Sequence, residues 1–133
     1  MPYKKIFYHI VWGTKNREPI ITPEIEPTLF GFIIRKAIGL GGIVHAINGS
    51  KYHVHLIVTI PVTITIAKFI GQIKGVSSAK INKSGLGDGS FYWQSEYSVY
   101  SIGEKELPFY KRYVKNQKIH HQDNIDLNNL ELQ

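Results

Sequence analysis

The sequence contains no cysteine among its 133 residues. This absence excludes disulfide bonds, a thiolate nucleophile and every zinc or iron–sulfur site that needs a cysteine ligand. The longest apolar runs are far shorter than the roughly 20 residues that a helix needs to cross a bilayer. The start of the chain alternates polar with apolar residues, which is not the pattern of a signal peptide. We therefore expect a cytoplasmic protein without a membrane partner, whose metal chemistry, if any, uses histidine, amide or carboxylate groups.

Acidic residues are also few. Ten Asp and Glu against 16 Lys and Arg give a formal net charge of +6. Hydrophobic residues make up 43% of the chain and can fill one core, which excludes a disordered or fibrous protein. No linker or repeat divides the sequence, so we expect a single domain over residues 1–133 with a frayed tail from about residue 122. A small basic domain favours a polyanionic partner, most often nucleic acid.

Apolar periodicity predicts the element order β-α-β-β-α-β, followed by one more helix. The predicted strands cover residues 5–14, 43–48, 53–60 and 91–102, the last as one long strand or two short ones. The predicted helices run from residue 22 or 23 to the glycines at 39–42, from residue 63 or 65 to the loop at 84–90, and from about residue 104 or 108 to 121. This order is typical of an α+β fold, a ferredoxin-like or RRM-like antiparallel sheet with an additional C-terminal helix.

Two histidines interrupt an otherwise apolar strand. Alternation puts His53 and His55 on one face, roughly 6.5–7 Å apart along the backbone, where two imidazoles can converge on one divalent metal. Val54 between them points to the opposite layer, as an apolar residue should. The alternative is that both histidines lie on the solvated face of an antiparallel sheet.

The predicted last helix carries a tyrosine and a glutamine one turn apart. The spacing of Tyr113 and Gln117 places both on one face, and an amide oxygen can complete a His/His/O site suited to Mg²⁺ or Mn²⁺. A phenol beside that metal could attack a phosphodiester as a nucleophile. The alternative is a tyrosine packed in the core and a solvated glutamine.

Positive charge is concentrated on the same helix. Lys111, Arg112 and Lys115 could hold a phosphate backbone against the tyrosine. They could equally form a solvated face, or cations placed favourably near a helix C-terminus. Taken together with the histidines, the tyrosine and the glutamine, they describe a site that nicks nucleic acid.

Four motifs link the chain to a known family: the opening strand Tyr8–Trp12 with the basic turn Thr14–Arg17, the segment His53–Leu56, the region 91–102, and Tyr113–Gln117. With these motifs the chain resembles the IS200/IS605-type single-stranded DNA transposases, the small Y1 members of the HUH endonuclease superfamily, including their REP-associated relatives. The resemblance covers nearly the whole chain. It implies a DNA-associated protein of bacterial or archaeal type.

The resemblance also implies the roles of particular residues. His53, His55 and Gln117 would bind Mg²⁺ or Mn²⁺, and Tyr113 would form a 5′-phosphotyrosine link to single-stranded DNA. A 3′-hydroxyl would then attack that link, so no nucleotide cofactor is needed. Family members recognise hairpins at element ends and form homodimers in which the last helix can complete the partner's site.

Position alone makes two residues of the basic turn, Lys15 and Arg17, candidate DNA contacts. One residue departs from the family pattern: many relatives have Asp before the first motif histidine, where this chain has Tyr52. Because strand residues alternate, we expect Tyr52 to point away from His53 and to have little effect on metal binding.

Three interpretations stay open. The first is the nicking and rejoining enzyme, in which Tyr110 is a rival nucleophile to Tyr113. The second is a non-catalytic module that binds single-stranded nucleic acid by stacking bases on Tyr8, Tyr92 or Trp93. The third is a metal hydrolase whose histidines activate water, which would leave no protein–DNA adduct.

Overall fold

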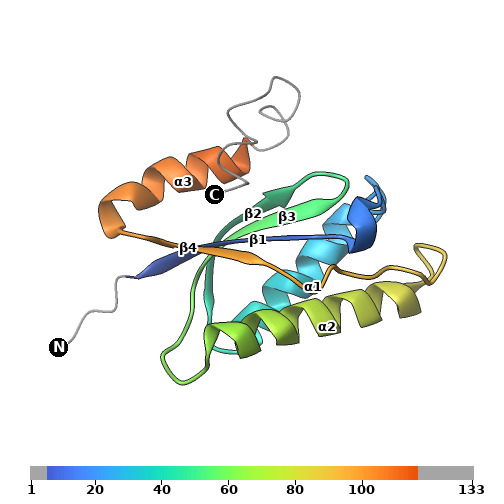
Figure 1. Cartoon of the computed structure of the whole chain (residues 1–133), viewed down its shortest axis with the longest axis horizontal. Helices are drawn as coiled ribbons and strands as arrows, with labels where there is room; N and C mark the ends of the chain where they lie inside the picture. Colours follow the sequence, from blue (N-terminus) through green and yellow to red (C-terminus); the bar gives the residue numbers. More distant parts are fainter. Residues whose placement is uncertain (1–5, 117–133) are drawn as a thin grey trace.

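Strands and helices follow one another along the chain in the predicted order. The computed structural model describes residues 6–116. Its elements are β1 (Phe7–Gly13), the 3-10 helix η1 (Lys15–Arg17), α1 (Glu26–Gly39), β2 (Ile43–Gly49), β3 (His53–Thr59), α2 (Ile66–Ser84), β4 (Ser98–Ile102), the 3-10 helix η2 (Glu104–Glu106) and α3 (Leu107–Lys115). The strands form one four-stranded antiparallel sheet in the order β2-β3-β1-β4 (Figure 1). The predicted ferredoxin-like α+β fold with an additional C-terminal helix is confirmed.

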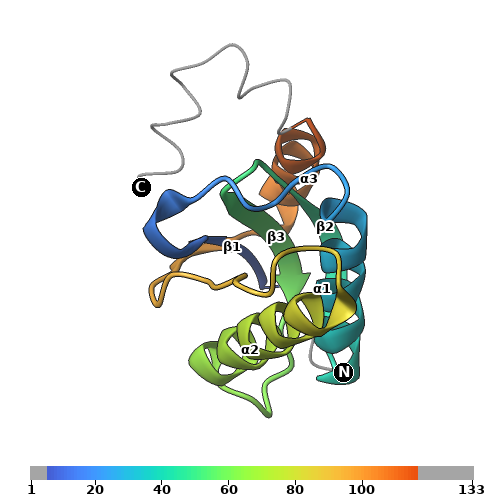
Figure 2. The ribbon, with the colours of Figure 1, turned by 90° about the vertical axis from the view of Figure 1, so that its right-hand side faces the viewer.

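The two faces of the sheet are covered by different helices. Helices α1 and α2 pack side by side on one face, and α3 lies across the other (Figures 1 and 2). The main core fills the first face with alternate residues of the central strands: Ile10 and Trp12 from β1, and Val54, Leu56 and Val58 from β3. The residues between them point to α3. As a result β3 is buried on both faces from His53 to Val58.

Helix α2 starts and stops at the residues that the sequence indicates. The hydroxyl of Thr65 accepts a hydrogen bond from the backbone N–H of Lys68 at 3.1 Å, and Gly85 ends the helix with a φ of 81°. The buried side of α2 continues from Ile73 to Ser77, which is fully buried, whereas Val76 is only half-buried. Helical geometry places residue 77, four after Ile73, directly under the sheet.

Two predicted boundaries differ from the structure. Helix α1 starts at Glu26, after a turn in which Thr22 accepts a hydrogen bond from the backbone N–H of Ile25 at 3.3 Å. The strand predicted over residues 91–102 is regular only in β4, and Trp93 forms an isolated bridge to Thr14. The ladder between β1 and β4 stops at the pair Val11–Ser98, two residues before β1 ends, and the Thr14–Trp93 bridge is shifted by two residues from that register.

Some predictions lie outside the described residues. These are the end of the last helix at residue 121, the third metal ligand Gln117 and the frayed tail from about residue 122. Within residues 6–116, no helix is long and apolar enough to cross a membrane.

The hairpin between β2 and β3 depends on a glycine, which allows a first test of the fold. A Cβ at Gly49 would overlap the carbonyl oxygen of His53 and lie 3.1 Å from the Cα of Val54. We expect Gly49→Ala to lower the free energy of unfolding by about 2 kcal/mol, because backbone cannot yield as a side chain can. The matched control is Gly71→Ala, where a Cβ meets nothing within 4 Å and the helix gains about 0.5–1 kcal/mol. Urea denaturation measures both, and equal stabilities of the two variants would contradict the hairpin geometry.

Candidate active site

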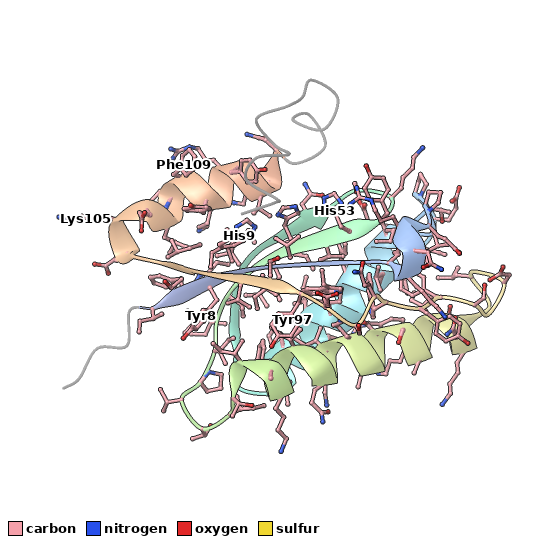
Figure 3. The ribbon with its side chains drawn as sticks, viewed as in Figure 1. Tyr8, His9, His53, Tyr97, Lys105 and Phe109 are labelled. Carbon is pink, nitrogen blue, oxygen red and sulfur yellow. The ribbon has the colours of Figure 1, made fainter. Side chains whose placement is uncertain are left out.

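The two motif histidines lie together beneath α3. His53 and His55 point to the same face, their ring centroids are 5.0 Å apart, and they are 7% and 0% exposed. Figure 3 shows His53 between the sheet and the helix. The predicted shared face is confirmed. The alternative of a solvated sheet face is wrong for these residues, because α3 covers them.

A third histidine, which sequence reasoning did not single out, completes this group. His9 of β1 is 1% exposed, and its Nε2 atom lies 2.8 Å from Nδ1 of His55 (Figure 3). In the antiparallel register Val11 is opposite His55, so His9 is its diagonal neighbour on the same face. Alternation along β1 places His9 on the other face of the sheet from the core residues Ile10 and Trp12. This alternation is the sequence signal from which His9 could have been identified.

Tyr113 extends from α3 onto the same histidines. Its ring centroid is 6.2 Å from that of His55 and 6.4 Å from that of His9. The side chain is half-buried. Tyr110, one turn earlier, packs against His9 with ring centroids 5.7 Å apart. The structure therefore brings both tyrosines to the histidine group, and Tyr113 to one of the two motif histidines.

Helix α3 is held on the sheet by a small apolar cluster and one polar clamp. The buried members of the cluster are Ala46, Ile57, Ile102 and Val114. The clamp is a hydrogen bond from the side-chain amide of Asn48 to the carbonyl oxygen of Lys115, at 3.0 Å. This bond fixes the C-terminal end of the helix over β2, two residues before Gln117, which lies outside the described residues.

The hydrogen bonds of the two motif histidines are compatible with a divalent cation. The hydroxyl of Ser50 lies 2.9 Å from Nδ1 of His53, and His9 occupies the same position on His55. In each ring these contacts are made by Nδ1, so a metal would be held through Nε2, and a group on the other nitrogen is what orients a ligating histidine. Residues 6–116 contain no group of three or more His, Cys, Asp or Glu that could hold a metal ion.

The basic residues predicted to contact DNA lie in two places. Lys111, Arg112 and Lys115 line a shallow hollow of about 270 Å³ on α3. Lys15 and Arg17 are exposed in η1, where β1 ends.

Arg17 is linked to the histidine group through Tyr52. The guanidinium carbon of Arg17 lies 4.7 Å from the centroid of the Tyr52 ring, which in turn is 5.3 Å from that of His53. The expectation that Tyr52 points away from His53 is wrong. Strand β3 begins at His53, so Tyr52 belongs to the preceding bend and strand alternation does not apply to it.

A fourth histidine on the α3 face has a shifted pKa. Burial lowers the pKa of His45, and the positive charge of Lys111 on α3 lowers it further. Its Nε2 atom lies 2.8 Å from the hydroxyl of Thr59, and its ring packs edge-on against Phe7 with centroids 5.1 Å apart. Protonation of His45 therefore works against the docking of α3.

The comparisons with known proteins identify one family from the sequence and similar folds from solved structures. Residues 2–117 match the sequence profile of the family described as "Transposase IS200 like". The fold is similar to a 1.90 Å crystal structure of a candidate transposase from Deinococcus radiodurans R1, with a TM-score of 0.69, 23% identity, and 87% of this chain and 93% of that chain covered. It is also similar to a REP-associated tyrosine transposase bound to a REP hairpin, with a TM-score of 0.64, 19% identity, and 91% and 72% covered. Among curated proteins, none matches this chain.

The lowered pKa of His45 predicts how stability depends on pH. Between its lowered folded value and its ordinary value of about 6.5, the unfolded chain binds more protons than the folded chain, so stability falls as pH decreases below about 6.5. We expect His45→Gln, which stays neutral and can still bond Thr59, to make the fall in urea-denaturation free energy between about pH 7 and pH 5 smaller. The control is Lys105→Gln, an exposed lysine of η2 that should leave the slope unchanged. A slope equally steep in His45→Gln would show that His45 contributes nothing to it.

Proposed function

We propose, from the premise that the chain belongs to the family of IS200-like transposases, that it nicks and rejoins single-stranded DNA through a tyrosine–phosphate linkage. The membership that the motifs predict is confirmed by the match over residues 2–117. The observation that carries the proposal is the position of the Tyr113 ring, 6.2 Å from that of His55. A phenol beside two convergent imidazoles is the combination that metal-assisted nucleophilic attack on a phosphodiester needs.

The proposed nucleophile is the phenol oxygen of Tyr113. The phenol loses its proton as its oxygen attacks phosphorus, the bond from phosphorus to the 3′ oxygen breaks, and that oxygen takes up a proton and leaves as a 3′-hydroxyl. The product is a 5′-phosphotyrosine that keeps the energy of the broken phosphodiester. Attack by another 3′-hydroxyl reverses these bond changes and releases the phenol.

His53 and His55 would hold one Mg²⁺ or Mn²⁺ through their Nε2 atoms, with Gln117 as the proposed third ligand. Such an ion polarises the phosphoryl oxygens and stabilises the leaving oxygen. The hydroxyl of Ser50 and the imidazole of His9 support this assignment, because they occupy Nδ1 of the two rings.

His9 would act as a positioning residue for His55. A metal-binding Nε2 must present its lone pair, so the proton of a neutral His55 ring resides on Nδ1 and is donated to Nε2 of His9. This donation fixes both the tautomer and the ring orientation of His55. A neutral imidazole thus takes the acceptor role that a carboxylate or carbonyl usually has beside a metal-bound histidine.

We further propose a hairpin-containing single strand as substrate and a homodimer as the active form. The structural neighbour bound to a REP hairpin supports a hairpin partner. The competing view, a non-catalytic module, is weakened because two of its three stacking candidates serve the fold. Tyr8 and Trp93 pack against the main core, and the Trp93 indole donates to the hydroxyl of Ser77 at 3.1 Å.

The covalent step gives a direct test. We expect wild-type protein, incubated with Mn²⁺ and labelled single-stranded flanks of its own gene, to form a protein–DNA adduct that survives denaturing electrophoresis. Tyr113→Phe should abolish the adduct, while Tyr110→Phe, which removes a neighbouring phenol of the same helix, should retain it. An adduct that persists in Tyr113→Phe but not in Tyr110→Phe would transfer the role to Tyr110. Cleavage by the wild type without any adduct would favour the hydrolase.

The positioning role of His9 is tested without any catalysis. We expect His9→Phe to weaken Mn²⁺ binding about 10- to 100-fold, because His55 loses the acceptor that orients it. His9→Gln should restore much of the affinity, since its amide oxygen can replace Nε2. The measurement is the electron paramagnetic resonance signal of unbound Mn²⁺ during titration. Tyr100→Phe is the control, because its ring packs 5.9 Å from that of His9 without touching the His9–His55 hydrogen bond. Unchanged affinity in a folded His9→Phe variant would refute the role.

A further inference from the structure

A continuous hollow follows the edge of the sheet on the α2 side. One part, of about 440 Å³, lies between α2 and the irregular segment 91–97. The other part, of about 790 Å³, lies between that segment and η1. Both are lined by residues 92–95, so they form one surface, which we call the side cleft. Figure 2 shows α2, the chain that leads into β4 and the turn after β1 next to one another.

We propose that the side cleft binds unpaired bases of the DNA strand on which Tyr113 acts, an inference that rests on the proposed function. Its principal residues are the cations Lys15, Arg17 and Lys74 and the aromatic residues Tyr92 and Tyr97. They combine cations with aromatic rings, which is the composition of surfaces that bind single strands.

Two aromatic rings of the side cleft are exposed. Tyr92 is 52% and Tyr97 is 38% exposed to solvent. Large apolar rings on a surface are costly to leave in water, and a nucleobase can cover them by stacking. A base paired within a duplex keeps its faces against its neighbours, whereas an unpaired base offers them to the protein. The rings therefore favour a single strand over a duplex.

The segment that carries these rings is held rigidly although it is not part of the sheet. The backbone N–H of Lys15 donates to the carbonyl of Tyr92, and the N–H of Gln94 donates to that of Gly13, both at 2.9 Å. The ammonium of Lys74 donates to the carbonyl of Gln94 at 2.6 Å. Because these bonds fix the wall of the cleft before any ligand arrives, little ordering cost remains for binding.

The charge of the side cleft suits a phosphate backbone. Lys15, Arg17 and Lys74 are positive, and among the described residues no acidic side chain lines either part. Arg17 adopts a left-handed backbone conformation with a φ of 53°, as does Asn16 with 57°. A left-handed backbone is uncommon for a residue such as arginine and often occurs at functional positions.

The side cleft is physically connected to the histidine group. Arg17, which lines the cleft, stacks on Tyr52 at 4.7 Å, and Tyr52 contacts His53 with centroids 5.3 Å apart. Tyr52 and Arg17 therefore lie between the histidines and the cleft, and a strand bound at both places would pass them.

Two variants of different kinds test the proposal. Tyr92→Ala removes a stacking ring, and Gly75→Leu fills the cleft from α2, where a Cβ meets nothing within 4 Å. The probe is a fluorescein-labelled oligothymidylate, and its fluorescence anisotropy gives Kd at one fixed salt concentration. We expect both variants to raise Kd at least about fivefold, and Tyr92→Phe to stay within about twofold of wild type. The control Phe109→Ala removes an aromatic ring that is 55% exposed on α3, and it should also stay within about twofold.

The outcomes separate the cleft from the enzyme. If both Tyr92→Ala and Gly75→Leu bind oligothymidylate with wild-type affinity, the side-cleft proposal is wrong. It is also wrong if the wild type binds oligothymidylate and a blunt duplex of the same length with equal affinity. The adduct assay on the wild type decides the proposed function independently. If the wild type forms the adduct and Tyr92→Ala binds oligothymidylate as tightly as the wild type, only the side-cleft proposal is wrong. If the wild type forms no adduct, the proposed enzymatic function is wrong.

Discussion

Because β3 is a central strand, its alternate residues face two different environments. Val54, Leu56 and Val58 are fully buried against α1 and α2, which forces His53 and His55 onto the opposite face. A shift of one residue in the register would put both imidazoles into the apolar core and expose the apolar residues to α3. The energy that fixes the register of the hydrophobic core therefore also fixes the direction of both motif histidines.

The α3 face has to accommodate polar groups that burial alone would penalise. A buried imidazole needs hydrogen-bonding partners, and each motif histidine has one: His9 of β1 for His55, and Ser50 of the turn between β2 and β3 for His53. The apolar cluster beneath α3 is much smaller than the main core, with four buried members against sixteen. The docking of this helix therefore depends strongly on specific contacts, such as the bond from Asn48 to Lys115. A helix attached in this way positions a tyrosine accurately only while those contacts hold.

Apolar periodicity predicted the strands, both helices that cover the sheet and the shared face of the two motif histidines. Each of these features depends on the residue pattern within a single segment. Features that depend on pairs of segments were missed. His9 lies beside His55 only because of the register of β1 against β3. The direction of the Tyr52 side chain was predicted wrongly because β3 begins one residue after it. The segment 91–97 has strand-like composition, but its contact with the end of β1 is shifted by two residues from the register of β4, and such a shift cannot be read from its own residues.

The turn after β1 is where the two faces of the sheet meet. Gly13, the last residue of β1, is paired with His53, and the backbone N–H of Thr14 donates to the carbonyl of Tyr52 at 2.8 Å. A Cβ at Gly13 would lie 3.2 Å from that same carbonyl oxygen, so the absence of a side chain lets the bend of Tyr52 approach closely. Lys15 and Arg17 follow directly and face the side cleft. A tight crossing of two strand ends thus brings a buried histidine and an exposed cationic surface within a few residues of each other, although they belong to opposite faces.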